Sequence, residues 1–272
     1  DEIEKTPVEI KWDAEAAEKA GFEHFMMKEI HEQPRALQDT LSSVVKDGVI
    51  DLSEMGLSDD EIRDVSQIYM VACGSAYHAA VSAQYVIEDL AKIPVRVELA
   101  SEFRYRTLLL DKKGLVILVS QSGETADTLA ALREAKKLGI RTLAIVNVVG
   151  SSIAREADKV FYTLAGPEIS VATTKAYSTQ LLACDILAVQ FAKARGEIDG
   201  ERYQGLIAEM GTLPEKITRI LQDTARLQWF ASKQAAAHDV FFIGRGIDYA
   251  ISMEGSLKMK EISYIHSEAY AA

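Results

Sequence analysis

Hydroxyl side chains gather around one glycine where an apolar run ends, and together they could bind an anion. They are Ser120, Ser122, Thr125 and Thr128 around Gly123, directly after the apolar run 115–119. Five consecutive apolar residues indicate a buried strand, and the polar residues after them indicate a turn that opens a helix. The first amides of a helix have no intrahelical partner and, with the helix dipole, favour a bound anion such as a phosphate. In the alternative interpretation, Ser122 or Thr125 only caps its own helix.

Two further polar loops are candidates for the same kind of chemistry. Residues 73–76 follow the apolar run 68–72, and residues 171–175 precede a long apolar segment that begins at Ala176. In a parallel α/β sheet, ligands bind beyond the carboxyl ends of the strands. Lys175 at the start of the apolar segment opposes the dipole of its helix, which favours a ligand-binding or structural role for this side chain.

The order of apolar segments predicts an α/β fold in three layers, with a parallel sheet and helices on both faces. Strands are expected at 68–72, 95–99, 115–119, 142–147 and 159–164. Helices are expected at 77–91, from 125 to 138, and at 176–195, 203–221 and 224–237. The helix at 176–195 is apolar around much of its surface, so we expect it to be buried between the sheet and a partner subunit.

One proline and three aromatic residues carry further expectations. Pro34 should split the helical pattern at 22–45 into two helices, or begin the second one. Trp229 and Phe230 are expected to be packing residues. Trp12 is expected to hold the charged segment 1–20 against the rest of the protein.

The last part of the chain repeats an earlier part. Residues 239–250 resemble residues 67–78, with Gly246 in the place of Gly74 and Tyr249 in the place of Tyr77. Such a repeat indicates duplicated domains. The second copy is expected to contain one strand, which could not pair its backbone amides alone. We therefore expect the chain to be a fragment of a longer protein.

Composition excludes several classes of protein. The chain has 272 residues and a net charge of −11, which argues against a nucleic-acid or anionic-membrane partner. A bound phosphate must therefore be held by local donors. Two cysteines are too few for a disulfide scaffold and fit a reducing cytosol. No basic segment followed by an apolar run opens the chain, so no signal peptide is expected.

Four separated segments resemble the isomerase region of the glutamine–fructose-6-phosphate aminotransferase (isomerizing) family, the glucosamine-6-phosphate synthases. In chain order they are residues 25–34, 120–128, 166–177 and 257–270. Members of this family have a glutaminase domain followed by two sugar-isomerase (SIS) domains. The resemblance implies a linker and N-terminal helices at 1–45, a first SIS domain at 46–215, and the beginning of a truncated second SIS domain at 216–272.

The resemblance also implies roles for individual residues. The phosphate and sugar contacts of a hexose 6-phosphate would come from Cys73, Gly74, Ser75, Ser120, Gln121, Ser122, Thr125, Val171 and Thr173. Glu261 matches the glutamate that moves a proton between C1 and C2, and Lys258 lies one helical turn earlier on the same face. Without the resemblance, Glu261 is interpreted as a surface residue paired with Lys258 or Lys260.

Two departures from the family pattern qualify this picture. Ser75 keeps one hydroxyl of the first loop, but Ala76 stands where a second is common, which removes one expected hydrogen bond to the sugar. The ring-opening histidine and the Schiff-base lysine of the family would lie beyond Ala272. The chain as given is therefore expected to be catalytically incomplete.

The implied activity is amino transfer from glutamine to fructose 6-phosphate with ketose-to-aldose isomerisation, the first step of hexosamine biosynthesis. The resemblance implies no metal or organic cofactor, a cytoplasmic homodimer, and a glutaminase domain in the same polypeptide as partner. One rival is an SIS-type sugar-phosphate-binding regulator, which would not need Glu261. Another is a fructose-amine deglycase, against which the segments 120–128 and 260–266 argue.

Overall fold

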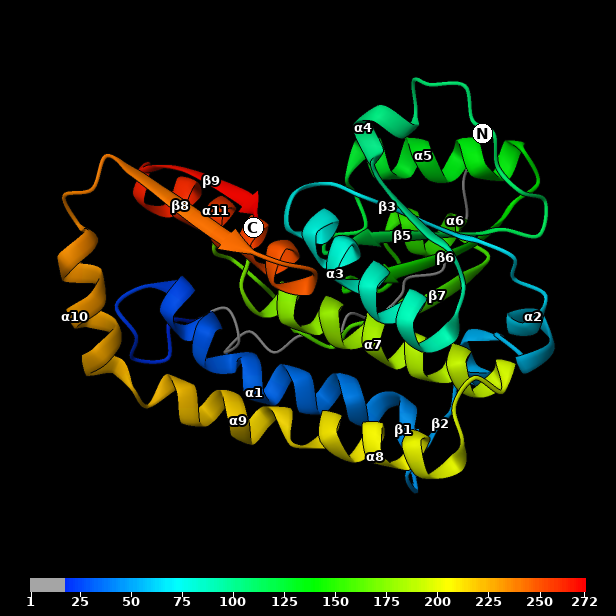
Figure 1. The fold of residues 1–272 in the computed structure, drawn as a ribbon, viewed down its shortest axis with the longest axis horizontal. Helices are drawn as coiled ribbons and strands as arrows, with labels where there is room; N and C mark the ends of the chain where they lie inside the picture. Colours follow the sequence, from blue (N-terminus) through cyan, green and yellow to red (C-terminus); the bar gives the residue numbers. More distant parts are fainter. Residues whose placement is uncertain (1–17) are drawn as a thin grey trace, which may run out of the picture.

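The computed structural model describes residues 18–272, so Trp12 and most of the expected linker lie outside the described residues (Figure 1). At its centre is a five-stranded parallel sheet in the order β4-β3-β5-β6-β7. The strands are β3 (Ile68–Ala72), β4 (Val95–Leu99), β5 (Leu115–Ser120), β6 (Arg141–Val146) and β7 (Lys159–Tyr162). The predicted parallel sheet is thus confirmed.

Helices cover both faces of the sheet and make the predicted three layers (Figure 1). One face carries α4 (Ala100–Phe103), α5 (Ala126–Lys137) and α6 (Ser152–Glu156), and the other carries α3 (Gly74–Ala91) and α7 (Lys175–Arg195). Alternate residues of β5 enter different cores: Ile117 and Val119 pack on the α3–α7 side, and Val116 and Leu118 on the α5 side. Each such buried side chain stabilises the fold by about 1.5–3 kcal/mol. The sheet is therefore a rigid platform for the loops at its carboxyl edge.

Helix α7 is buried by the chain itself. Besides the sheet, it packs mainly against α3, α1 (Phe25–Val44) and α2 (Asp59–Arg63), and 14 of its 21 residues are buried in the single chain. The expectation that a partner subunit covers this helix is therefore wrong, because α1 takes that place (Figure 1). None of the helices described in residues 18–272, α7 included, has the length and apolar character to cross a membrane.

Helix α1 continues through Pro34 without a break, so the predicted division into two helices is wrong. Pro34 has no N–H to donate to the carbonyl oxygen of Ile30, four residues earlier. The Gln33 side chain donates to that oxygen instead, at 2.9 Å from Nε2. Packing of α1 against α7 and against α9 (Leu213–Leu221) further offsets the cost of the proline.

Short elements connect α1 toward the central sheet, and three helices, called the helical arm, connect α7 to the C-terminal part. The short elements are β1 (Val45–Lys46), β2 (Val49–Ile50) and the 3-10 helix η2 (Ser53–Met55). The arm consists of α8 (Gly200–Gly211), α9 and α10 (Thr224–Gln234). Trp229 and Phe230 on α10 are 61% and 60% exposed, so the expectation that they pack in a core of this chain is wrong.

The C-terminal part is a β–α–β unit. It comprises β8 (Asp239–Gly244), α11 (Ile247–Ser263) and β9 (His266–Ala271), and β8 pairs with β9 in parallel. The expectation of a single strand is wrong, because α11 crosses over and returns the chain beside β8. Phe241, Ile243 and Tyr270 nevertheless stay exposed, so this small sheet has an uncovered apolar surface. Parallel sheets are normally covered on both faces.

We expect Asp185 on α7 to make the stability of the fold depend on pH. Burial raises the pKa of Asp185 from its ordinary 3.8 to about 7, and no other described residue forms a hydrogen bond or ion pair with it. The folded state then holds a proton that the unfolded state releases, so unfolding free energy falls as pH rises from about 4 to 7. We expect Asp185→Asn to match wild type near pH 4 and to be more stable by about 1–4 kcal/mol at pH 8. Urea denaturation at both pH values measures this.

The exposed Asp89 on α3 offers a matched control. Asp89→Asn should follow the wild-type pH curve. If Asp185→Asn gains no stability at pH 8, Asp185 is not the source of the pH dependence.

Candidate functional site

The strand order places a crevice between β3 and β5. The chain runs from β3 to β4 on one side and then crosses to β5 on the other side of β3, and ligands bind at such a switch in strand order. The loops 73–76 and 120–125 follow these two strands. Together with the loop 166–174 and α11 they enclose a pocket of about 340 Å³, within the size range of small-molecule sites.

The pocket brings together all predicted site residues except one. Its lining includes Cys73, Ser75, Ser120, Gln121, Ser122, Thr125, Val171, Thr173, Lys258 and Glu261. Gly74 does not line it. This residue begins α3 with φ 57°, a conformation that favours glycine, so it lets the chain turn from β3 into α3. Four segments far apart in the sequence thus meet at one place.

The turn after β5 is held from behind by hydrogen bonds. Ser120 Oγ accepts the Gly123 amide at 3.1 Å and lies 3.1 Å from Thr125 Oγ1. Gly123 has φ 65°, and a Cβ added to it would lie 2.0 Å from Ser151 Oγ. Only glycine fits this position, so the path of the turn is fixed by both the backbone and its neighbour.

The capping interpretation of this turn is wrong. Thr125 is the N-cap residue of α5, but no side chain forms a cap hydrogen bond there. Ser122 Oγ accepts the amide of Glu124, which precedes the helix. The amino end of the 12-residue α5 therefore keeps its first amides available, and Asp127 in its first turn is neutralised by Arg104 at 2.6 Å.

On the opposite wall, α11 presents a line of charged side chains. Glu254, Lys258 and Glu261 are spaced by four and three residues, so they share one face of the helix. Lys258 Nζ lies 3.5 Å from Glu254 Oε1 and contacts Glu261 Oε2. The pairing of Glu261 with Lys258 is thus present, but both residues line the pocket rather than a distant surface.

Glu254 connects the charged face of α11 to the loop 73–76 and to α3. Its buried carboxylate accepts a hydrogen bond from Ser75 Oγ at 2.7 Å and lies 2.8 Å from His78 Nδ1. Sequence reasoning missed Glu254, although its position four residues before Lys258 was a signal that could have found it. The residue joins α11 to α3, which lie side by side (Figure 1).

Comparisons with known proteins agree with this geometry. The SIS domain family matches residues 61–190. A curated glutamine–fructose-6-phosphate aminotransferase (isomerizing) of Caldanaerobacter subterraneus subsp. tengcongensis is 54% identical over 99% of this chain and 45% of its own length. The one of Methanosarcina mazei is 48% identical, over 99% of this chain and 44% of its own length. The C-terminal domain of glucosamine-fructose-6-phosphate aminotransferase from Francisella tularensis is 40% identical, with a TM-score of 0.90 over 93% of this chain and 71% of that one.

The chain belongs to the glutamine–fructose-6-phosphate aminotransferase family. It spans less than half the length of the curated relatives it matches. Another solved structure, of a phosphosugar isomerase described as putative from Silicibacter pomeroyi, is 31% identical, with a TM-score of 0.74 over 91% of this chain and 71% of that one. The recognition made from four sequence segments is therefore confirmed, as is the SIS-type α/β fold.

In this family member, the hydroxyl groups that line the pocket fall into two kinds. Ser75 and Thr173 donate to the carboxylates of Glu254 and Glu168, at 2.7 and 2.6 Å. Because a carboxylate only accepts, these two hydroxyls offer the pocket their lone pairs. Ser122 accepts from a backbone amide, so its proton remains free to donate. The sequence alone could not reveal this division.

Two amide oxygens in the pocket lack partners. Gln121 Oε1 and Gln180 Oε1 are buried without a hydrogen bond from any described residue, and both residues line the pocket. A buried acceptor left unsatisfied costs about 1–3 kcal/mol. Ligand hydroxyl groups would satisfy both oxygens. Gln180 was not predicted, because it lies within the apolar helix α7.

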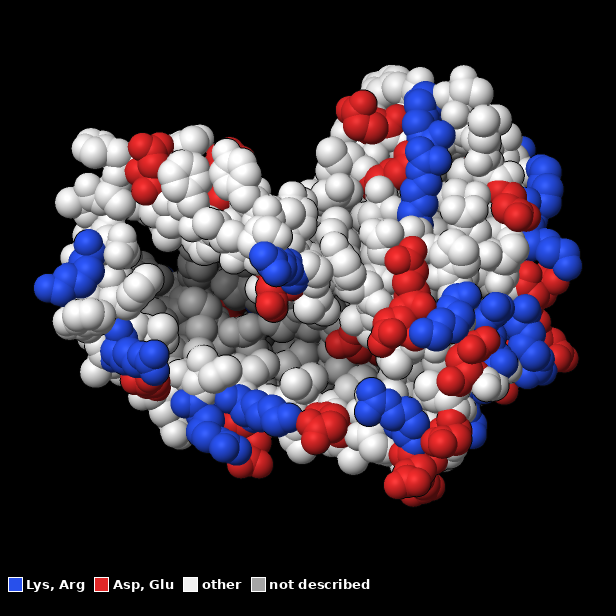
Figure 2. All heavy atoms as spheres, in the orientation of Figure 1, with Lys and Arg blue, Asp and Glu red and all other residues white. Residues whose placement is uncertain are grey.

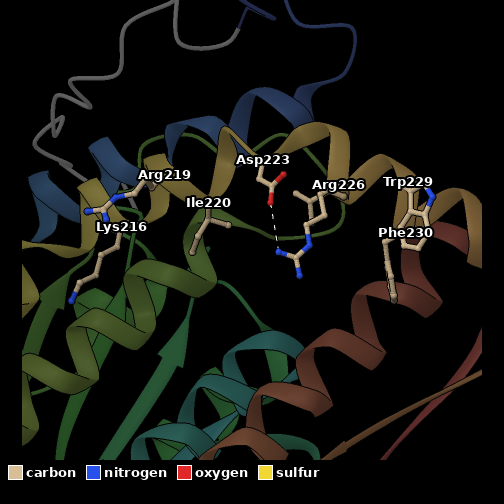
Figure 3. Close-up of a pocket in the computed structure, with 8 residues that line it drawn as sticks. Lys216, Arg219, Ile220, Asp223, Arg226, Trp229 and Phe230 are labelled. Carbon is tan, nitrogen blue, oxygen red and sulfur yellow. Dashed lines mark ion pairs between the residues drawn. The ribbon is translucent and has the colours of Figure 1, made fainter.

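A larger hollow lies along α9 and α10, and none of the residues that line it is buried. Figure 3 shows it along α9 and α10, where Asp223 Oδ2 lies 3.9 Å from Arg226 Nη1. Its volume is about 910 Å³, and it is lined by Lys216, Arg219, Ile220, Asp223, Arg226, Leu227, Trp229 and Phe230. These side chains lie on exposed helix faces, where charges are screened by solvent. Acidic and basic groups are also interspersed over the visible surface (Figure 2).

Removing Glu254 should destabilise this family member strongly. Glu254→Ala leaves Ser75 and His78 without their buried partner, so we expect the unfolding free energy to fall by about 2–4 kcal/mol. Urea denaturation measures it. Glu215→Ala on the exposed face of α9, which breaks only the surface pair with Arg219, should cost less than about 1 kcal/mol. Equal losses in the two variants would show that the Glu254 contacts are not structural.

Among the described residues, no group of three or more His, Cys, Asp or Glu side chains is arranged to hold a metal ion. The family resemblance implied no metal or organic cofactor, and that remains a prediction.

Proposed function

We propose that this chain is the part of a glutamine–fructose-6-phosphate aminotransferase that binds hexose 6-phosphate and carries the base for its isomerisation. The proposal rests on one observation. A hydroxyl-rich turn at a helix start and the Lys258–Glu261 pair line the same pocket, although more than 120 residues separate them in the sequence. A phosphate site and a carboxylate base are the two parts that such a reaction requires.

The phosphate group is assigned to the turn 120–125 and the amino end of α5. Ser122 has a free hydroxyl proton, and the first amides of α5 have no side-chain cap. Lys258 is the single basic side chain among the residues that line the pocket. Neutral donors and the helix dipole therefore supply most of the attraction, as the net charge of −11 requires.

The sugar is assigned to the other two loops. Ser75 and Thr173 offer acceptor lone pairs, and Gln121 and Gln180 offer unsatisfied amide oxygens. A hexose carries several hydroxyl donors that match these acceptors. The apolar side chain of Val171 is fully exposed at the pocket and would cover a bound sugar from solvent.

Glu261 is proposed to transfer the proton between C1 and C2. Its carboxylate contacts Lys258 Nζ and lines the pocket, where it can accept a proton from a bound sugar. A ketose-to-aldose exchange needs such a base on a carbon beside a carbonyl or imine. Binding and proton transfer are the steps assigned to the described residues.

The domain organisation follows from the same family membership. We propose that residues 46–215 form a first SIS domain and residues 216–272 open a second one. The uncovered face of Phe241, Ile243 and Tyr270 supports this, because a complete parallel sheet would cover it. A glutaminase domain in the same polypeptide, a homodimer and a cytoplasmic location are proposed from the family resemblance.

Calorimetric titration of the chain tests the proposed ligand. Fructose 6-phosphate and glucosamine 6-phosphate should bind, and unphosphorylated fructose should bind at least about 100-fold more weakly, because it lacks the charge-assisted hydrogen bonds of the phosphate. Ser122→Ala should weaken hexose 6-phosphate binding by about tenfold. Equal affinities for fructose and fructose 6-phosphate would refute the phosphate assignment. A regulator would bind the same ligands, and only Glu261-dependent isomerisation separates the two.

A further inference from the structure

Helix α1 carries a row of side chains that hold the segment 164–178, although the two lie over 120 residues apart. Thr40 Oγ1 accepts the amide of Leu164 at 3.2 Å, and Gln33 Oε1 accepts the hydroxyl of Ser178 at 2.5 Å. The contacts at both ends of the segment thus come from the same helix. The proposed function assigned no role to this helix, which contains one of the four family segments.

Glu29 makes the most buried of these contacts. Its side chain is 1% exposed, and Oε1 accepts the backbone amides of Ile169 at 2.6 Å and Ser170 at 3.1 Å. One carboxylate oxygen therefore fixes two consecutive amides of a loop that has no secondary structure of its own. Burying a carboxylate costs several kcal/mol unless it is hydrogen bonded, so the loop and Glu29 depend on each other.

Glu32 holds the end of the same loop through a lysine. Lys175 Nζ lies 2.7 Å from Glu32 Oε2, and the lysine is 3% exposed. Lys28 Nζ lies 3.6 Å from the other oxygen of Glu32. Lys175 is thus committed to α1 and does not line the pocket, which resolves its expected role as structural.

Within the loop, Glu168 connects the part held by α1 to the residues that line the pocket. Its carboxylate accepts Thr173 Oγ1 at 2.6 Å and the amide of Thr174 at 2.9 Å. Val171 and Thr173, the two sugar contacts of this loop, thus lie between the amides held by Glu29 and the lysine held by Glu32. The loop is fixed on both sides of the residues that reach the ligand.

We propose that Glu29 and Glu32 are positioning residues, which act through the loop 166–174 to set the sugar-binding wall of the pocket. They touch no ligand themselves. The inference rests on the proposed function for its sugar-binding part. It predicts a selective defect, because α1 holds the loop 166–174, whereas the phosphate turn 120–125 is held by its own hydrogen bonds and by those with Asn147, Ser152 and Ile153.

Amide hydrogen exchange of the chain tests the first half without any ligand. In Glu29→Ala, the amides of Ile169 and Ser170 should exchange at least about tenfold faster than in wild type, while amides of β5 stay unchanged. Glu29→Gln keeps one acceptor oxygen and should restore most of the protection. Asp39→Ala, on the exposed face of the same helix, is the matched control and should leave both amides protected. Unchanged exchange in Glu29→Ala would overturn the proposal.

Calorimetric titration tests the second half. Glu29→Ala should weaken fructose 6-phosphate by about tenfold and leave inorganic phosphate within about twofold of wild type. Glu32→Gln should show the same selectivity, and it provides an independent variant if Glu29→Ala does not fold. Equal losses for both ligands, or none, would contradict a positioning role. If wild type binds neither ligand, the proposed function fails. The exchange experiment would still test whether Glu29 holds the loop 166–174 in place.

Discussion

Glu261→Gln is expected to lower kcat for hexose 6-phosphate isomerisation by about 10²–10⁴-fold in a protein with the full length of the curated relatives. Glutamine has nearly the same shape and can still contact Lys258, but it cannot accept a proton from carbon. Because Glu261 is assigned to proton transfer and not to the phosphate, the Kd for fructose 6-phosphate should stay within about threefold of wild type. Steady-state kinetics together with calorimetry separates the two quantities.

A neighbouring glutamate supplies the control for this experiment. Glu268 on β9 lies in the same β–α–β unit, but it does not line the pocket. Glu268→Gln should keep kcat within about twofold of wild type. If Glu261→Gln isomerises as fast as this control, Glu261 is not the base, and a sugar-phosphate-binding regulator becomes the better account of the pocket.

Gly123→Ala is expected to weaken hexose 6-phosphate binding by at least about 30-fold. The added Cβ would lie 2.0 Å from Ser151 Oγ and 2.6 Å from Ser151 Cβ, so the backbone at residue 123 must move. That movement breaks the hydrogen bond from the Gly123 amide to Ser120 Oγ and displaces Ser122, the proposed phosphate donor. Calorimetric titration with fructose 6-phosphate measures the loss.

Gly139 offers a matched control. Replacing it with alanine strains the backbone in the same way as at Gly123 but causes no steric clash. Gly139 follows the other end of α5 with φ 70°, close to the 65° of Gly123, and no atom lies within 4 Å of an added Cβ. Gly139→Ala should lower stability by about 1 kcal/mol through its left-handed conformation and leave ligand affinity unchanged. If the two variants bind fructose 6-phosphate equally well, the turn does not form the phosphate site.

The parts of the fold that were predictable are those with a strong local signal. The apolar run of β5 and the hydroxyl-rich turn after it predicted a buried strand and a helix start, and both are present. The predicted break at Pro34 was wrong because the neighbouring Gln33 side chain replaces the hydrogen bond that proline cannot donate. General rules for proline do not include this compensation. Strand β9 was missed because it has few β-branched or large apolar residues. Its pairing depends on the crossover made by α11.

The predicted site residues came from local segments, whereas their organisation depends on contacts across the fold. The pocket contains the predicted hydroxyls and the Lys258–Glu261 pair, but Glu254 and Glu168 decide which hydroxyls donate and which accept. Those carboxylates lie 179 and five residues from their respective partners. The burial of α7 was read correctly from its apolar surface, but its cover could not be identified, because α1 precedes it by more than 100 residues.

A crystal structure of the chain with fructose 6-phosphate would show where the phosphate and the sugar bind. We expect the phosphate within hydrogen-bond distance of Ser122 Oγ and the first amides of α5, with the sugar between Thr173 and the Glu261 carboxylate. A phosphate bound instead to Lys216, Arg219 or Arg226 in the hollow along α9 and α10 would contradict the proposed function (Figure 3). So would an empty pocket between β3 and β5 at saturating ligand.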